Sequence, residues 1–232
     1  VAHDGDAVGD ALELIHAVRD IDDADAGLLE LPDEDGLFEL RDVPHGTLTQ
    51  EFYKSKISDN WEKLILYLPP CVPSAGLPVL YLQHGFGESE ISWSTTGKVN
   101  ILMDNLIAAG KIKPFAIVMG NGMVKQRIDG ELKLNRALYG QMLVEEILPM
   151  IEKKYQFGGS KEKRGMAGLS MGSVQTTRTI CAHPELFSEV GIFSGFLRDR
   201  IVGDEEHDGI VPKSGGQSYL KAMDDAAFNT YF

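Results

Sequence analysis

The chain has 232 residues, of which 43% are hydrophobic and 25% are charged, a composition that can build one large globular α/β domain or two small ones. No apolar run is long enough to cross a membrane, no signal peptide is visible, and two cysteines are too few for a disulfide framework. Residues 1–45 hold 14 acidic residues and two arginines, so nearly all of the net charge of −13 lies there. We therefore expect no nucleic-acid partner and no membrane partner.

The N-terminal part divides into an acidic segment and the start of a β-structure. Residues 1–36 are rich in Asp, Gly and Ala and show no sustained hydrophobic period. Residues 35–44 alternate like a short exposed strand, and the alternation returns over 47–56 and 61–68, where Pro69-Pro70 ends the third strand. We place the boundary near residue 44, which predicts an acidic segment over 1–44 and a main domain over 45–232.

From residue 77 onward, predicted strands alternate with predicted helices. Four short and nearly continuous apolar runs are typical of parallel strands buried on both faces: 77–83, 115–120, 164–169 and 190–194. Helices are predicted over 99–109, with Gly110 as the C-cap, and over 138–155, where Pro149 kinks the helix or starts a new one. The alternation predicts a doubly wound, mostly parallel α/β sheet, whose functional sites gather at the carboxyl ends of the strands.

One of these strands ends in the sequence Gly168-Leu169-Ser170-Met171-Gly172, and a helical segment follows it. The pattern G-x-S-x-G between a strand and a helix is typical of a nucleophile elbow, in which a sharp turn exposes the serine hydroxyl. The backbone N–H of Met171 is then one oxyanion donor. A second donor is expected from the loop after an earlier strand, and His84-Gly85-Phe86-Gly87 lies there, with the N–H of Phe86 as the candidate.

Two further residues near this predicted site have two interpretations each. His84 either contacts substrate or packs the loop. It is not expected to be the general base, because general bases in this architecture come later in the chain. Trp93 either lines the substrate pocket or belongs to the core. The six histidines show no metal-ligand spacing, and no Gly-Lys-Ser/Thr follows the glycine-rich segments, so we predict neither a metal nor another cofactor.

Further short segments match a known family in order along the chain: Asp42–Gly46, Leu66–Pro70, Pro78–Gly85, Trp93, Leu102–Gly110, Ala167–Gly172, Phe187 and Phe193–Gly195. From about Asp42 to Phe232 the chain resembles the esterase-D-like serine esterases, and within them carbohydrate esterase family one, the feruloyl and acetylxylan esterases. The resemblance implies an α/β-hydrolase with Ser170 as nucleophile and with Phe86 and Met171 as oxyanion donors. It also implies that the N-terminal segment is the remnant of, or the linker from, a β-sandwich carbohydrate-binding module.

The remaining triad members do not follow in the order that this fold requires, which is Ser, then Asp or Glu, then His. Downstream of Ser170 the only histidines are His183, near the far end of the predicted helix, and His207, in an acidic segment that reads as a surface loop. We expect the sheet to lack its last strands, and the triad acid and histidine to lie beyond Phe232. A C-terminal fragment or a second chain would then complete the site.

The predicted function is a serine esterase that removes feruloyl or acetyl groups from xylan through an acyl-enzyme, and its substrate partner is the esterified polysaccharide. The alternatives are a hydrolase of S-formylglutathione or other small esters, and a non-catalytic carbohydrate-binding protein that retains the fold. The sequence of the expected lid loop, residues 198–214, does not indicate whether the substrate carries feruloyl or acetyl groups. A polysaccharide substrate leads us to expect a secreted or periplasmic protein, and the oligomeric state stays open.

Overall fold

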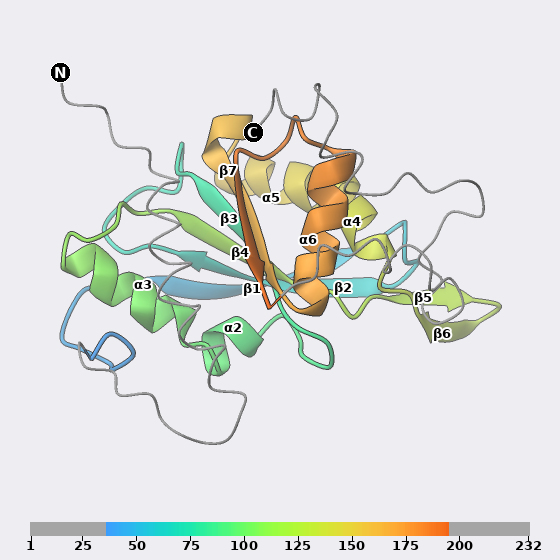
Figure 1. Ribbon diagram of the computed structural model, residues 1–232, viewed down its shortest axis with the longest axis horizontal. Helices are drawn as coiled ribbons and strands as arrows, with labels where there is room; N and C mark the ends of the chain where they lie inside the picture. Colours follow the sequence, from blue (N-terminus) through green and yellow to red (C-terminus); the bar gives the residue numbers. More distant parts are fainter. Residues whose placement is uncertain (1–35, 195–232) are drawn as a thin grey trace.

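The computed structural model describes residues 36–194, which form a six-stranded sheet with the order β1-β2-β4-β3-β7-β8 (Figure 1). Its strands are β1 (Thr47–Lys54), β2 (Trp61–Leu68), β3 (Val79–Gln83), β4 (Ala116–Gly120), β7 (Arg164–Leu169) and β8 (Glu189–Phe193). The pairs β1/β2 and β2/β4 are antiparallel, whereas β4, β3, β7 and β8 run parallel. This mostly parallel sheet is the doubly wound arrangement predicted from the sequence.

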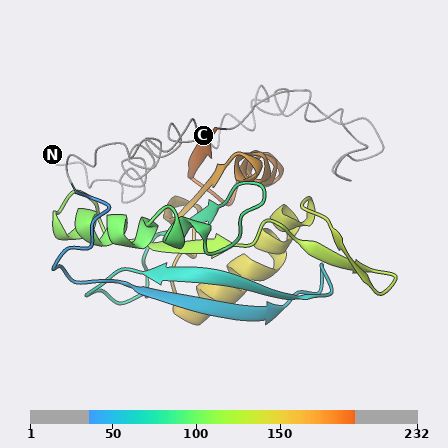
Figure 2. The ribbon, with the colours of Figure 1, turned by 90° about the horizontal axis from the view of Figure 1, so that it is seen from below.

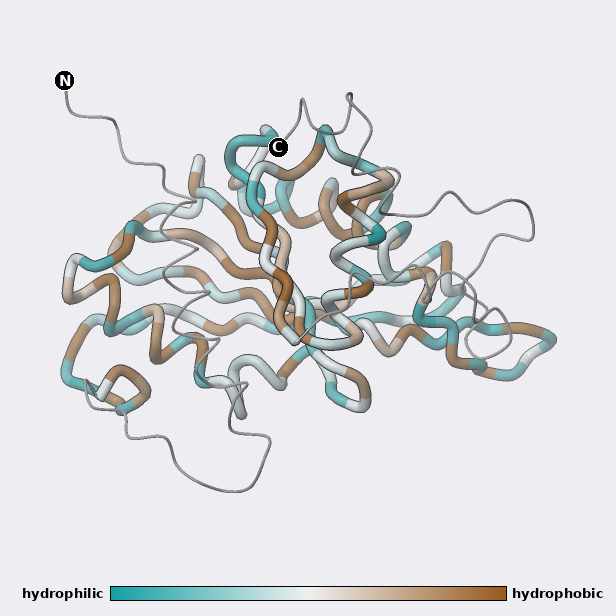
Figure 3. The backbone as a smooth tube through the Cα atoms, viewed as in Figure 1, coloured by the Kyte–Doolittle hydropathy of each residue, from teal (hydrophilic) through white to brown (hydrophobic). Residues whose placement is uncertain are grey.

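The central strands form where the sequence is continuously apolar. Every residue of β3 and of β4 is buried, as expected for parallel strands covered on both faces. Along β2, in contrast, buried and exposed residues alternate at its start, where one face of the strand is open to solvent. The hydropathy of the backbone follows this division, since apolar segments concentrate in the middle of the sheet (Figure 3). The four predicted buried strands are confirmed, with ends that differ by at most two residues.

Helices cover both faces of the sheet (Figures 1 and 2). On one face lie α2 (Ser92–Thr95) and α3 (Val99–Ala108); on the other lie α4 (Leu138–Met142), α5 (Leu148–Tyr155) and α6 (Met171–Ala182). A π-helical turn, η2 (Leu143–Ile147), joins α4 to α5, and a 3₁₀ turn, η3 (Lys161–Lys163), precedes β7. None of the helices within residues 36–194 is both long and apolar enough to span a bilayer.

The two predicted helix punctuation signals have the expected effects. Gly110 follows α3 with φ of +68°, the left-handed conformation that ends many helices, and its N–H donates to the carbonyl of Ile107. Pro149 lies in the first turn of α5, directly after the π-helical turn, because a residue without an N–H is tolerated at a helix start. The predicted helix 138–155 is therefore three helical segments in succession.

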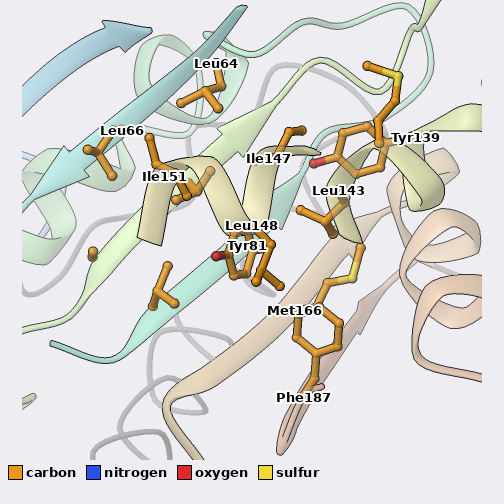
Figure 4. Packing of buried hydrophobic residues seen from close by; sticks show 14 of the residues in the cluster. Leu64, Leu66, Tyr81, Tyr139, Leu143, Ile147, Leu148, Ile151, Met166 and Phe187 are labelled. Carbon is orange, nitrogen blue, oxygen red and sulfur yellow. The ribbon is translucent and has the colours of Figure 1, made fainter. Parts of the chain in front are cut away.

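The core consists of two clusters, one on each face of the sheet. Figure 4 shows the cluster beneath α4 and α5, where Tyr81, Met166 and Phe187 face residues of those helices. The rings of Tyr81 and Phe187 meet edge-on at 6.1 Å. The buried hydroxyl of Tyr81 donates to Glu152, which also forms a two-point ion pair with Arg164 (N–O distances 2.7 and 2.8 Å). The polar groups of Tyr81, Glu152 and Arg164 are thus paired with one another inside this core.

The expected strand over 35–44 is wrong within the described residues, which form turns and bends as far as Gly46. Leu37 and Phe38 pack instead against the core cluster beneath α3. The side-chain amide of Asn105 on α3 donates to the carbonyls of Leu37 and Glu39, so these backbone groups are bonded to a helix rather than to a neighbouring strand. Leu37 and Phe38, which lie upstream of the boundary near residue 44, thus contact the core of the sheet, and the boundary itself stays a prediction. The rest of the acidic segment, residues 1–35, lies outside the described residues.

A small hairpin was missed in the sequence. Strands β5 (Lys125–Ile128) and β6 (Glu131–Leu134) form a separate two-stranded sheet whose turn is Asp129-Gly130, with positive φ at both residues. Asp-Gly between two short alternating segments is a strong signal for a type I′ hairpin, so the sequence did contain the information.

Candidate active site

The backbone of Ser170 has the strained conformation of a nucleophile elbow. Ser170 lies between β7 and α6 with φ of +50° and ψ of −107°, a region that non-glycine residues rarely adopt, and its side chain is exposed. Its own N–H donates to the carbonyl of Phe193 at the end of β8 (2.9 Å). The turn is thus fixed to the neighbouring strand while the hydroxyl stands clear at the carboxyl edge of the sheet.

Both glycines of the motif are required by close backbone contacts. A Cβ on Gly168 would lie 2.3 Å from the carbonyl carbon and oxygen of Gly172, because the strand and the helix cross there. A Cβ on Gly172 would lie 2.6 Å from the carbonyl oxygen of Gln83 and 2.7 Å from that of His84. The motif therefore packs α6 directly against the end of β3, where the loop with Phe86 begins.

The two predicted oxyanion donors are available on neighbouring segments. Met171 is the first residue of α6, where backbone N–H groups have no partner within the helix. Phe86 and Gly87 are the central residues of a turn closed by the hydrogen bond from the N–H of Glu88 to the carbonyl of Gly85. Within residues 36–194, neither the N–H of Phe86 nor that of Met171 donates to a protein acceptor. The N–H of Ser170, in contrast, is bonded to Phe193, and the role of Phe86 and Met171 as oxyanion donors stays a prediction.

Sequence reasoning missed the residues that hold this turn. The carboxylate of Glu88 accepts a hydrogen bond from the N–H of Gly85 (2.6 Å), and the guanidinium of Arg136 lies 4.8 Å from the centre of the Phe86 ring. The spacing of Glu88, three residues after Gly85, resembles a side-chain cap and could have been recognised. The contact between Arg136 and Phe86 joins residues 50 positions apart, and no local pattern predicts it.

His84 lies inside the loop rather than in an open pocket. Its side chain is 1% exposed, its Nδ1 donates to the carbonyl of Gly85 (2.8 Å), and its Nε2 accepts from the N–H of Gly122 (3.0 Å). Burial lowers the pKa of His84, only partly opposed by the Gly85 carbonyl, so the ring is neutral. Both ring nitrogens are occupied by backbone groups, and none is left for a substrate. The structure favours the interpretation of His84 as a residue that packs the loop.

We expect the folded state to lose stability as the pH falls below about 6.5, the unperturbed pKa of histidine, because the unfolded chain takes up a proton that folded His84 resists. The loss should continue until the pH reaches the lowered pKa of the folded state. In the variant His84→Gln, this part of the pH dependence should disappear, although the variant is less stable at pH 8. Thermal unfolding of both proteins between pH 8 and 5 provides the measurement, and parallel curves would contradict the assignment.

Trp93 is part of the core beneath α3. It is 6% exposed, and its ring lies 6.2 Å from that of Phe193. The structure thus favours the core alternative for Trp93 over a place on an open pocket wall. Trp93 packs against Phe193, and the carbonyl of Phe193 accepts the hydrogen bond from the N–H of Ser170, so Trp93 contacts a residue that holds the elbow.

None of the three histidines within residues 36–194 contacts the Ser170 hydroxyl. His45 pairs with the buried carboxylate of Asp104 (3.0 Å), His84 is enclosed in its loop, and His183 ends α6 beside Glu185. The predicted position of His183 is thus confirmed. His207, the lid 198–214 and any triad acid or histidine beyond Phe232 lie outside the described residues.

The described part of the chain also contains no group of three or more His, Cys, Asp or Glu side chains that could hold a metal ion. Cys71 and Cys181 are both free thiols.

Comparison with known proteins agrees with this geometry. A family model described as Esterase matches residues 55–230. The chain is 37% identical, over 176 residues, to an endo-1,4-β-xylanase/feruloyl esterase of Xylanibacter ruminicola; the match covers 72% of this chain and 24% of that protein. The chain thus spans about a quarter of the length of this relative.

Solved structures with the same fold include two feruloyl esterases. A ferulic acid esterase of carbohydrate esterase family one from Anaeromyces mucronatus, in complex with ferulic acid, superposes with a TM-score of 0.63 at 22% identity, over 71% of this chain and 63% of that one. A mutant of the feruloyl esterase module from Clostridium thermocellum, complexed with sinapinate, gives a TM-score of 0.61 at 20% identity, over 84% and 65% of the two chains.

The sheet order, the elbow at Ser170 and the match to an esterase family model define an α/β-hydrolase of the serine-esterase type. Within that class, the chain belongs to the Esterase family.

Proposed function

We propose that the protein hydrolyses feruloyl esters of plant cell-wall polysaccharide through an acyl-enzyme formed on Ser170. The observation that carries the proposal is the exposed Ser170 hydroxyl on a positive-φ turn at the start of α6. Such strain has no structural benefit of its own, whereas it places a nucleophile at the carboxyl edge of the sheet. The choice of feruloyl esters is supported by the relative that is 37% identical.

The reaction proceeds in two steps, acylation of Ser170 and hydrolysis of the acyl-enzyme. The Ser170 oxygen attacks the ester carbonyl while a base takes the hydroxyl proton, and the negative charge on the former carbonyl oxygen is stabilised by the amides of Phe86 and Met171. The bond between the carbonyl carbon and the sugar oxygen then breaks, this oxygen takes the proton from the base, and the feruloyl group stays bound to Ser170 as an ester. Water attacks this ester in the same way and releases ferulate. The base and its acid partner come from outside residues 36–194.

A fluorophosphonate probe tests whether Ser170 is the nucleophile. We expect one probe per chain, located by mass spectrometry on the peptide that contains Ser170, and no incorporation into Ser170→Ala. Absence of labelling in the native protein would instead favour a non-catalytic carbohydrate-binding protein.

The acyl group and the alcohol need separate tests, because acetylxylan and S-formylglutathione are the competing substrates. We expect ferulate release from feruloylated arabinoxylan to exceed acetate release from acetylated xylan and hydrolysis of S-formylglutathione when each is measured at equal ester concentration. We also propose that the protein is secreted or periplasmic, since its polymeric substrate lies outside the cell. Cell fractionation of the native host would test this location.

A further inference from the structure

Two large aromatic side chains lie exposed on one face of the β1–β2 pair. Phe52 on β1 is 60% exposed and Trp61 on β2 is 67% exposed, although both belong to residue types that are usually buried. In the antiparallel register, Phe52 lies opposite Lys63 and Trp61 lies opposite Lys54. Residues opposite each other point to the same face, so the two aromatic rings are diagonal neighbours, with Cα atoms about 7–8 Å apart. We call the surface formed by these four residues the aromatic platform.

The charges on the aromatic platform are already neutralised. Lys54 pairs with Asp59 at 2.9 Å, and Lys63 pairs with the buried Glu90 at 2.6 Å. An anionic polymer would have to compete with these carboxylates, and the chain as a whole carries a net charge of −13. Flat apolar rings between polar but neutralised side chains suit a neutral polyhydroxylated ligand, whose C–H faces stack on the rings and whose hydroxyl groups bond at the edges.

The aromatic platform lies at the same edge of the sheet as Ser170. Leu64 near the start of β2 pairs with Gly120 at the end of β4, so β2 begins, and β1 ends, at the carboxyl edge of the parallel strands. This end of the β1–β2 pair lies toward β5 and β6 in Figures 1 and 2. At a spacing of about 4.8 Å per strand, β2 and β1 are about 14 and 19 Å from β7. Several sugar units span that distance.

One segment of the chain connects the aromatic platform with the loop beside Ser170. The loop that carries Phe86 leads to Glu90, whose carboxylate reaches Lys63 on the aromatic platform. Phe86 (61% exposed) and Ile91 (43% exposed) are the large apolar side chains that this segment exposes within residues 36–194.

We propose that the aromatic platform binds the unsubstituted backbone of the polysaccharide whose ester is cleaved at Ser170. The choice of polymer rests on the proposed function. Stacking on Phe52 and Trp61 holds the chain across the carboxyl edge, so that a substituted sugar is presented to the elbow without a contact between the aromatic platform and the acyl group.

The test uses the full chain with Ser170→Ala and de-esterified arabinoxylan, so that binding is measured without turnover and without an acyl group. The chain has two tryptophans, and Trp93 is 6% exposed, so a change in exposed tryptophan emission on titration reports on Trp61. We expect saturable binding and a blue shift of this emission. Affinity for arabinoxylan should be about tenfold weaker after Phe52→Ala or Trp61→Ala. Because Trp61→Ala removes the reporter, its affinity is measured by affinity electrophoresis.

Leu48→Ala is the matched control, because Leu48 is 45% exposed on the same face of β1 but at the opposite end. It should bind arabinoxylan like the unmodified protein. Absence of binding by Ser170→Ala, unchanged affinity in Trp61→Ala, or a change of oligomeric state in Trp61→Ala would each overturn the proposal. Fluorophosphonate labelling is measured separately, on Phe52→Ala and Trp61→Ala proteins that retain Ser170, and it should match that of the unmodified protein. Failure of this inference is therefore distinguishable from failure of the proposed function.

Discussion

Replacement of Ser170 by alanine is expected to lower kcat/KM for methyl ferulate by about 10⁴- to 10⁶-fold. The physical reason is that the acyl-enzyme cannot form, while the amides of Phe86 and Met171 still stabilise a developing oxyanion and leave a small residual rate. Ferulate release followed by absorbance under saturating and limiting substrate gives the two constants separately.

Ser94→Ala is a suitable control, because within residues 36–194 the Ser94 hydroxyl bonds to the carbonyl of Ile91 in its own helical turn and to no other group. It should retain the native rate. A Ser170→Ala protein with more than about one hundredth of the native activity would show that another group performs the chemistry.

Gly172→Ala should give the second largest effect, about a hundredfold loss of activity together with a destabilisation of about 1–3 kcal/mol. The added Cβ would meet the carbonyl oxygens of Gln83 and His84 at 2.6 and 2.7 Å, and both are backbone atoms that cannot rotate away. The end of β3 and α6 must separate, which moves the N–H of Phe86 relative to that of Met171. The rate of fluorophosphonate labelling measures the geometry, and urea unfolding measures the stability.

Gly110→Ala separates these two effects. Gly110 has φ of +68° but no atom within 4 Å of an added Cβ, so this substitution strains the end of α3 without a collision. It should cost about 1 kcal/mol of stability and leave the labelling rate unchanged. A comparable loss of labelling in Gly110→Ala would mean that instability, not displaced backbone, explains the Gly172→Ala result.

The sequence could predict those parts of the fold that depend on local patterns. The all-apolar strands β3 and β4 and the Gly110 helix end follow from rules that act within a few residues. The expected strand over 35–44 failed because a distant side chain, that of Asn105, bonds its backbone. The β5–β6 hairpin was missed although its Asp129-Gly130 turn is a local signal.

The same division holds for the candidate site. The sequence by itself determined that Ser170 lies between a strand and a helix, because G-x-S-x-G follows an apolar run and only glycines allow the two backbones to pass so closely. Only the tertiary structure decided that His84 faces backbone groups from a second loop, that Trp93 lies in the core, and that Arg136 packs on Phe86. These contacts join residues far apart in sequence, and a side chain's surroundings are fixed by the packing of separate elements, which local patterns do not contain.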